Sequence, residues 1–151
     1  MWNTMLMGLR NLSRQLGRTI LTLCALGTGA FLSGVAAQFV SPIIVPAVLF
    51  VVAGVTAFMT GTSWGTYGIL VPVAIPLALG SGVPPSLALA AVLGGGVFGD
   101  HCSPISDTSI IASLAAECDH IEHVRTQLPY ALSAGLLAVV SYLAAGIATT
   151  L

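Results

Sequence analysis

Long apolar stretches fill most of the chain and are separated by a few short polar segments. The stretch from Thr19 to Val40 carries no charged residue over about 22 positions, which is enough to cross a bilayer core at about 1.5 Å per residue. The stretch from Leu128 to Leu151 has a similar length of about 24 residues and is expected to start at Pro129. Both stretches are predicted to be membrane-spanning helices.

Two shorter apolar segments lie between these spans, at Ile43 to Met59 and at Tyr67 to Gly80. The polar sequence TGTSWGT, from Thr60 to Thr66, joins them. The second segment has only about 14 residues and contains Pro72 and Pro76, which makes it short for a full crossing. The pattern predicts a re-entrant hairpin whose polar tip lies inside the membrane. Two kinked helices that each cross the membrane are the alternative.

The sequence GDHCSPISDTSII, from Gly99 to Ile111, interrupts a further apolar region with ionisable and hydroxyl side chains. A helix is predicted before it, at Ser86 to Phe98, and a half-helix after it, at Thr108 to Ala116. Pro104 has no N–H to donate, so it breaks the helix and frees carbonyl groups near Asp100. Loosened backbone survives in a membrane only where protein or a water-filled cavity covers it. This region is therefore predicted to be an interrupted transmembrane helix.

The composition indicates a membrane protein with one small membrane domain. Of the 151 residues, 56% are hydrophobic and 6% are charged, and the mean hydropathy is +1.01. A soluble domain usually carries about 25% charged residues. The net charge of −1 gives no reason to expect a nucleic-acid partner. The fold class is therefore predicted to be an all-α membrane protein, with a membrane domain over residues 19–151.

The first 18 residues carry three arginines, Arg10, Arg14 and Arg18, each four residues from the next. Leucines lie between them, so the segment is predicted to form a basic amphipathic helix at an anionic membrane surface. A secretory signal peptide and a transit peptide are the alternatives for this segment. Positively charged residues favour the cytoplasmic side, so the amino terminus and Arg125 are both expected to be cytoplasmic.

The two polar interruptions hold the residues that suit a small cation. Broken membrane helices offer carbonyl oxygens from unwound backbone, and carboxylates and hydroxyls complete a ligand set. Burial disfavours the charged form of a carboxylate, so a buried one can hold either a proton or a cation. This competition is the simplest physical basis for exchange of a cation for a proton. The candidate ion ligands are Asp107, Asp100, Thr108, Ser106, Ser103, Thr62, Ser63 and Thr66.

Structural roles compete with ion binding at several of these positions. Asp107 is expected to supply the negative charge, and the alternative is that it only caps the half-helix that begins at Thr108. Thr62 and Ser63 have the same alternative as caps of a helix. His101 is a candidate proton relay, and a hydrogen-bonded structural histidine is the alternative.

One charged segment, from Glu117 to Gln127, lies between the half-helix and the last span. It is predicted to be a solvated loop. Its residues His120, Glu122 and His123 offer pH sensing or zinc binding as the alternative. The three cysteines of the chain are an odd number in unlike contexts, so they predict no disulfide framework.

Three motifs in order carry a resemblance to a known family: TGTSWGT, then GDHCSPISDTS, then CDHIEHVRTQLPYAL at Cys118 to Leu132. Over most of Ala47 to Gly146 the chain resembles the carboxy-terminal part of the NhaC-type Na+/H+ antiporter family. The resemblance implies two inverted repeats, each with a re-entrant hairpin and an interrupted helix that meet at a midplane site. It implies that Thr60 to Thr66 is the hairpin tip and that Asp100 to Thr108 is the unwound segment. It also implies secondary transport of Na+ against H+, or of an organic solute with Na+.

Antiporters of this type are several hundred residues long, so the chain resembles only their second half. It is expected to work in the bilayer of a bacterial or archaeal plasma membrane with a partner, which is either a separate amino-terminal half or another copy of itself. Na+ and H+ are expected as transported ions, with no cofactor and no enzymatic activity. The alternatives are an incomplete fragment, a membrane assembly subunit that does not transport, and a metal-dependent hydrolase that uses Asp100, His101 and Cys102. The hydrolase is disfavoured because HExxH and similar ligand spacings are absent from the sequence.

Overall fold

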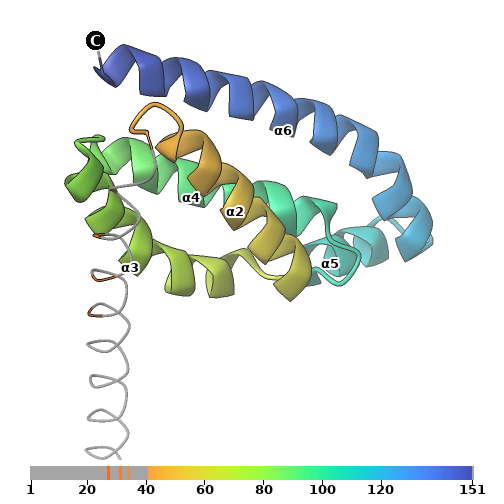
Figure 1. The fold of residues 1–151 in the computed structure, drawn as a ribbon. Coiled ribbons are helices and arrows are strands. Elements are labelled where there is room, and N and C mark those ends of the chain that lie inside the picture. Colours follow the sequence, from red (N-terminus) through yellow and green to blue (C-terminus); the bar gives the residue numbers. More distant parts are fainter. Residues whose placement is uncertain (1–26, 28–30, 32–33, 35–40, 151) are drawn as a thin grey trace, which may run out of the picture.

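The computed structural model describes residues 27, 31, 34 and 41–150. The amphipathic helix predicted for residues 1–18 lies outside this range, as does nearly all of the span predicted for Thr19 to Val40. Every regular element in residues 41–150 is a helix (Figure 1). The helices are α2 (Val45–Thr60), α3 (Ser63–Ser81), α4 (Pro85–Cys102), α5 (Asp107–Ala115) and α6 (His120–Thr150).

Helix α4 is the centre of the arrangement, because it contacts each of the other four described helices. Half of the residues in the buried core are alanines, which lets the helix axes approach closely. Larger partly buried residues, such as Tyr67 and Phe98, pack around this core. The core residues are Val45, Leu49, Phe50, Ala53, Ala74, Ala78, Val83, Ala88, Ala91 and Val92.

Helices α2 and α4 run in the same direction and touch along a stripe of small residues on α4. Gly95 and Gly99 lie so close to backbone carbonyls of α2 that neither position has room for a side chain. One turn further along, the Ser103 hydroxyl donates a hydrogen bond to another α2 carbonyl at 2.8 Å. Small residues at four-residue spacing are a common basis for close helix packing in membranes. The carbonyls that meet this stripe also advance by four residues, at Phe50, Gly54 and Phe58.

Helix α6 packs across α2 and α4 through aromatic rings. The rings of Phe50 and Phe98 stack with their centroids 5.5 Å apart, and the ring of Tyr142 lies 5.4 Å from that of Phe50. The Tyr142 hydroxyl also donates to a backbone carbonyl of α4 at 2.9 Å. One turn after Tyr142 on α6, Gly146 lies directly against the carbonyl of Ile43. The carboxyl end of α6 therefore lies beside the start of α2.

Helices α3 and α6 are each long and apolar enough to cross a membrane, and α2 is a shorter apolar helix. The second arm of the predicted hairpin has 19 residues rather than about 14, because the polar residues from Ser63 onward join the helix. Pro72 and Pro76 lie inside α3, and the helix changes direction along its length (Figure 1). Only Gly61 and Thr62 separate α2 from α3.

The loop predicted for Glu117 to Gln127 is wrong over most of its length, because α6 begins at His120. The Asp119 carboxylate accepts a hydrogen bond from the Glu122 backbone N–H at 3.0 Å, which is the contact expected of a helix cap. The helix then continues through Pro129 instead of beginning there. Near its amino end α6 turns toward α5 (Figure 1), and a proline inside a helix is the usual cause of such a bend.

Replacement of Gly99 with alanine is expected to destabilise the protein by about 1–3 kcal/mol, the usual range for overpacking. The added methyl group would strike the Gly54 carbonyl and force α2 and α4 apart. The change can be measured as a lower thermal unfolding midpoint of the detergent-solubilised protein. Gly68→Ala is the matched control, since nothing lies within 4 Å of the added carbon there. Equal midpoints for the two variants would contradict a tight α2–α4 contact.

Candidate functional site

The two polar interruptions of the sequence meet in the folded chain. Gly61 ends α2 with a φ of 67°, a left-handed conformation that favours glycine. A side-chain carbon at this position would lie 2.6 Å from the carbonyl oxygen of Ile105. The hydrogen bond from Ser103 to the Phe58 carbonyl makes a second link between the same two regions. The turn between α2 and α3 therefore rests directly on residues 103–106.

Residues 103–106 separate α4 from α5 without helical backbone. Ser103 and Ser106 have ψ angles of 128° and 132°, which are values of extended chain. Pro104 explains the first of these, because a proline disfavours helical backbone in the residue before it and cannot donate to the preceding turn. The Ser106 hydroxyl then caps α5 by accepting from the Ser109 backbone N–H at 3.4 Å. One helix ends and the next begins within four residues.

This break folds two hydroxyl groups back onto Asp100, whose side chain is only 2% exposed. Ser106 Oγ donates to Asp100 Oδ1 at 2.9 Å, and Thr108 Oγ1 donates to Asp100 Oδ2 at 2.7 Å. In an unbroken helix Thr108 would lie about 12 Å further along the axis than Asp100. The non-helical residues are therefore what brings these three side chains together. They are called the Asp100 cluster below.

The Asp100 cluster contains three short oxygen–oxygen contacts, because Ser106 Oγ and Thr108 Oγ1 also lie 2.8 Å apart. The two hydroxyls supply only two protons. With an ionised carboxylate, both protons point to Asp100 and no proton lies between the hydroxyls. With a protonated carboxyl, all three contacts become hydrogen bonds in a closed ring. The three contacts therefore have room for one more proton than the two hydroxyls supply.

The carboxylate of Asp100 has no cationic side chain beside it in the described part of the chain. Arg125 is the sole arginine of residues 41–150, and it is exposed on α6. An unpaired charge in the membrane core costs several kcal/mol, and hydrogen bonds from two hydroxyls offset only part of that cost. The described residues therefore leave an ionised Asp100 without a cationic side chain beside it.

The polar residues of the turn between α2 and α3 have structural contacts of their own. Thr62 caps α3, with its hydroxyl 3.5 Å from the Gly65 backbone nitrogen. Thr66 is fully buried, and its hydroxyl donates to the Thr62 carbonyl at 3.0 Å. Ser63 is the first residue of α3 and is half-buried. Within residues 41–150, no hydrogen bond joins these side chains to the Asp100 cluster.

Asp107 lies apart from the cluster, with an exposed side chain in the first turn of α5. The helix begins at Asp107 rather than at Thr108, and Ser106 holds the cap position expected for Asp107. One Asp107 carboxylate oxygen accepts from the Thr108 backbone N–H at 2.9 Å. A carboxylate in the first turn of a helix is favoured by the helix dipole. Its place in an ion site stays a prediction.

Of two histidines in this part of the fold, His120 contacts the break and His101 contacts only its own helix. His101 is exposed, and its Nδ1 lies 2.9 Å from the Val97 carbonyl oxygen. His120 Nε2 lies 2.7 Å from the Pro104 carbonyl oxygen, and its Nδ1 lies 3.1 Å from Ser113 Oγ. His120 therefore joins the start of α6 to the break. The position of His120 in the sequence does not predict its contact with Pro104, because this contact depends on how α6 folds back onto the break.

Residues 22–147 of the sequence match the Na+/H+ antiporter family. This match covers most of the chain. The chain belongs to the Na+/H+ antiporter family. The expected kinship with NhaC-type antiporters is thereby confirmed. The family is one of membrane transporters rather than enzymes.

Several known proteins are similar to this antiporter-family chain. An uncharacterized protein of Haemophilus influenzae is 44% identical over 122 residues, which are 79% of this chain and 23% of that protein. The malate-2H+/Na+-lactate antiporter of Bacillus subtilis is 34% identical over 114 residues, which are 72% of this chain and 24% of that protein. The Na+/H+ antiporter NhaC of Alkalihalophilus pseudofirmus is 29% identical over 92 residues, which are 61% and 20%. The chain spans about a quarter of the length of the curated relatives it matches. No solved structure gives a significant match.

Alanine at Gly61 is expected to destabilise the protein more than alanine at Gly82. Both glycines end a helix with positive φ, 67° and 76°, so both substitutions carry the left-handed strain of about 1–2 kcal/mol. Only at Gly61 does the added methyl group also meet the Ile105 carbonyl, because nothing lies within 4 Å at Gly82. Thermal unfolding of the two variants side by side isolates the contact between the turn and the break. A loss at Gly82 as large as at Gly61 would contradict that contact.

Proposed function

We propose that this chain forms part of a membrane antiporter that exchanges Na+ for H+, with Asp100 as the carboxylate that holds either ion. The Asp100 cluster carries this proposal. Asp100 is buried, it lacks a cationic partner in the described residues, and the two hydroxyls on it leave one positive charge unsupplied. A proton on the carboxyl or a small cation against the same oxygens supplies that charge equally well. Competition between them links the movement of one ion to that of the other.

Carboxylate and hydroxyl oxygens are ligands that a hard cation prefers. In the proton-bound form, Ser106 and Thr108 complete a ring of hydrogen bonds with the neutral carboxyl. In the cation-bound form, both hydroxyls turn a lone pair toward the ion while the carboxylate is charged. Backbone carbonyls freed by Pro104 offer further oxygen ligands. Ser103, Thr62, Ser63 and Thr66 remain candidates for the rest of the ion path, and Asp107 is the alternative to Asp100 as the source of the negative charge.

The resemblance to NhaC-type antiporters implies a re-entrant hairpin and an interrupted helix in these segments. We infer that α2 and α3 are a re-entrant hairpin and that α4 and α5 are the two parts of one interrupted helix. Support comes from the short length of α2 and from the contact of its end at Gly61 with the break at Ile105. With a cytoplasmic amino terminus, α4 runs inward and leaves exposed Arg125 on the cytoplasmic side. The localisation proposed is a bacterial or archaeal plasma membrane.

A quarter of a transporter cannot enclose this site from all sides. Unwound backbone and ionisable groups at membrane depth need protein or a water-filled cavity around them. We propose that the chain works together with the parts that make up the remaining length of its relatives, on the same or another polypeptide, or with a second parallel copy of itself. This assembly in the bilayer is called the assembled antiporter below.

Exchange of Na+ for H+ coupled to an organic solute is the second candidate function. It rests on one observation, the 34% identity with a protein named as a malate-2H+/Na+-lactate antiporter. An oxygen-lined site takes Na+ in both cases. The two candidates differ only in whether an external organic acid accelerates Na+ movement through the assembled antiporter.

Asp100→Asn in the assembled antiporter is expected to abolish Na+-driven proton movement. The amide keeps the shape of the side chain and an oxygen for hydrogen bonding, but it can neither take up a proton nor balance a cation. Exchange can be followed as a pH change inside vesicles after a pulse of Na+. Asp107→Asn, the matched control, removes an exposed carboxylate of the same break and is expected to retain exchange.

Normal exchange by the Asp100→Asn variant would overturn the proposed role of Asp100. If Asp107→Asn instead abolished exchange, the negative charge of the site would be at Asp107. Vesicles that contain this chain alone are expected to show no exchange, because the rest of the site is missing. Robust exchange by the chain alone would contradict the need for a partner.

Cysteines placed singly at Thr62 and Gly82 are expected to distinguish a re-entrant hairpin from two full crossings. Gly82, between α3 and α4, should react rapidly from outside with a bulky reagent that does not cross membranes. Thr62, at the turn between α2 and α3, should react slowly or from one side only. Labelling of Thr62 from the cytoplasm at the rate of a true loop would favour two full spans.

A further inference from the structure

The chain reverses direction between α5 and α6 in a tight turn at residues 116–119. Glu117 has a φ of 51°, a left-handed conformation that a residue with a side chain rarely adopts. The next backbone N–H, that of Cys118, closes the end of α5 by a hydrogen bond to the Ser113 carbonyl at 3.1 Å. Asp119 then caps α6, so the first residue of α6, His120, returns to α5 (Figure 1).

The His120 ring lies between α5 and the break and contacts both. Its Nε2 lies 2.7 Å from the Pro104 carbonyl oxygen, and a carbonyl can only accept, so Nε2 carries a hydrogen and donates it. Its Nδ1 lies 3.1 Å from the hydroxyl oxygen of Ser113, which is 1% exposed. That hydroxyl also donates to the Ile110 carbonyl at 2.8 Å. A buried serine therefore fixes the orientation in which the ring meets Pro104.

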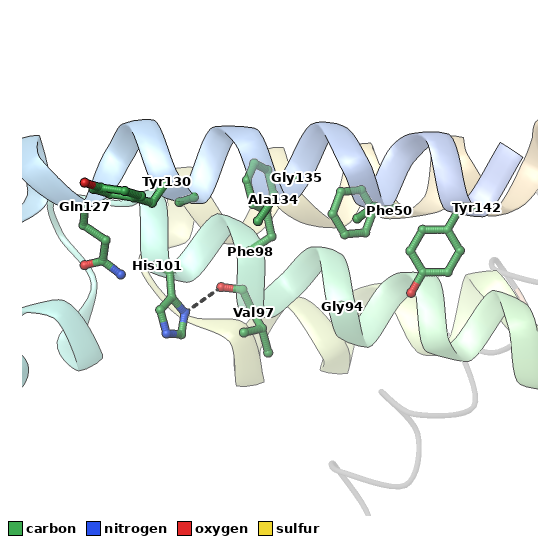
Figure 2. A pocket seen from close by; sticks show the side chains of 12 residues that line it. Phe50, Gly94, Val97, Phe98, His101, Gln127, Tyr130, Ala134, Gly135 and Tyr142 are labelled. Carbon is green, nitrogen blue, oxygen red and sulfur yellow. Dashed lines mark hydrogen bonds between the residues drawn. The ribbon is translucent and has the colours of Figure 1, made fainter.

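Elsewhere the first turns of α6 lie apart from α4. A cavity of about 450 Å³ separates the two helices, with Tyr130 on α6 and His101 on α4 at one end (Figure 2). A second cavity of about 430 Å³ adjoins it and extends to α5. Within residues 41–150, the side chains of α6 that hydrogen-bond to other helices or to the break are His120 and Tyr142. His120 is therefore the polar contact that fixes the amino end of α6 in place.

The break has little support from hydrogen bonds of its own. The Ser106 backbone N–H donates to the Ser103 carbonyl at 3.4 Å, and the Ile105 N–H donates to the Ser103 hydroxyl at 3.3 Å, which are both long. The contacts with neighbouring helices are shorter, at 2.8 Å to α2 through Ser103 and at 2.7 Å to α6 through Pro104. The break is thus held from outside, by α2 on one side and by α6 on the other.

A short path leads from His120 to the Asp100 carboxyl. Pro104 lies two residues before Ser106 in the non-helical chain, and Ser106 Oγ donates to Asp100 Oδ1 at 2.9 Å. Thr108, two residues further, donates to Asp100 Oδ2 at 2.7 Å. A shift of the Pro104 carbonyl therefore moves the hydroxyls of the Asp100 cluster, because no helical turn holds Ser106 apart from Pro104.

We propose that His120 is a positioning residue for the ion site, which holds the break where Ser106 and Thr108 reach Asp100. The inference rests on the proposed function, because it takes Asp100 as the carboxylate at which Na+ and H+ compete. Oxygens already held in place bind a cation without a further cost of ordering the chain. A cation needs several oxygens at once, whereas a proton needs the carboxyl alone. Loss of the His120 contact therefore weakens the binding of Na+ more than that of H+.

Asparagine and glutamine at position 120 separate the two contacts of the ring. The amide of asparagine ends near the place of Nδ1, so it can reach Ser113 but not Pro104. The amide nitrogen of glutamine reaches the place of Nε2 and can donate to the Pro104 carbonyl. His120→Asn in the assembled antiporter is expected to raise the Na+ concentration for half-maximal exchange about tenfold or more, the usual effect of losing a group that orients a metal ligand. His120→Gln is expected to keep a value near that of the wild type, and exchange at saturating Na+ should change little in either variant.

His123→Asn is the matched control. His123 lies one turn further along α6, and within residues 41–150 only its backbone makes hydrogen bonds. Its replacement should leave the half-maximal Na+ concentration unchanged. A general loss of stability predicts another pattern, in which both variants at position 120 lower the maximal rate and glutamine gives no rescue.

The labelling rate of Cys102 tests the break without reference to transport. Cys102 is the last residue of α4, directly before the break, and is 5% exposed. With Cys24 and Cys118 replaced by serine, a small thiol reagent should react faster with Cys102 in the His120→Asn variant than in the wild type. His120→Gln should keep the slow rate of the wild type, because it retains the hydrogen bond to Pro104.

The outcomes separate this inference from the proposed function. If Asp100→Asn abolishes exchange while His120→Asn and His120→Gln have equal half-maximal Na+ concentrations, Asp100 stands and the positioning role of His120 is overturned. Equal labelling of Cys102 in these two variants would show that the bond to Pro104 does not hold the break, which overturns the role as well. If Asp100→Asn exchanges normally, the proposed function fails and this inference fails with it.

Discussion

The burial of one carboxylate in an apolar helix bundle is the constraint on which the rest of this structure depends. Asp100 is 2% exposed, and a bare charge at that depth would be too costly for a small protein to carry. The chain meets the constraint by giving up helical backbone at residues 103–106, so that Ser106 and Thr108 can reach the carboxyl oxygens. The loss of regular backbone creates a second need, since free backbone groups must also be covered. The end of α2 provides part of that cover through Gly61 and Phe58.

Local signals in the sequence predicted the polar interruptions well, because they depend on residues close together in the chain. Pro104 and the serines around it mark a helix break by their own backbone chemistry. The polar segment before Tyr67 likewise marks a turn between two apolar helices. The turn lies where it was expected, although α3 begins four residues earlier than Tyr67, at Ser63. The break is shorter than expected, because residues 103–106 alone are non-helical and the rest of the segment predicted from Asp100 to Thr108 is helical.

The two aspartates show that nearby residues in the sequence do not predict which carboxylate is buried. The sequence offers both Asp100 and Asp107 as candidate ion ligands, and Asp107 is the one expected from it to supply the negative charge. In the fold Asp100 is buried and accepts hydrogen bonds from Ser106 and Thr108, whereas Asp107 is exposed. Burial is set by which neighbour covers a residue, and no spacing rule encodes that. The same limit hid His120, which reaches Pro104 only because Asp119 starts α6 early.

The stripe of contacts between α2 and α4 has a consequence for how such a transporter moves. The carbonyls of Phe50, Gly54 and Phe58 contact one residue each on successive turns of α4, namely Gly95, Gly99 and Ser103. These contacts fix the position of each helix along the other. Sliding by less than one turn, about 5.4 Å, would drive side chains into backbone. The end of α2 and the break at residues 103–106 are therefore held against each other as a single body. In the exchange function proposed above, access to Asp100 from the two sides of the membrane then requires other parts of the transporter to move around that body.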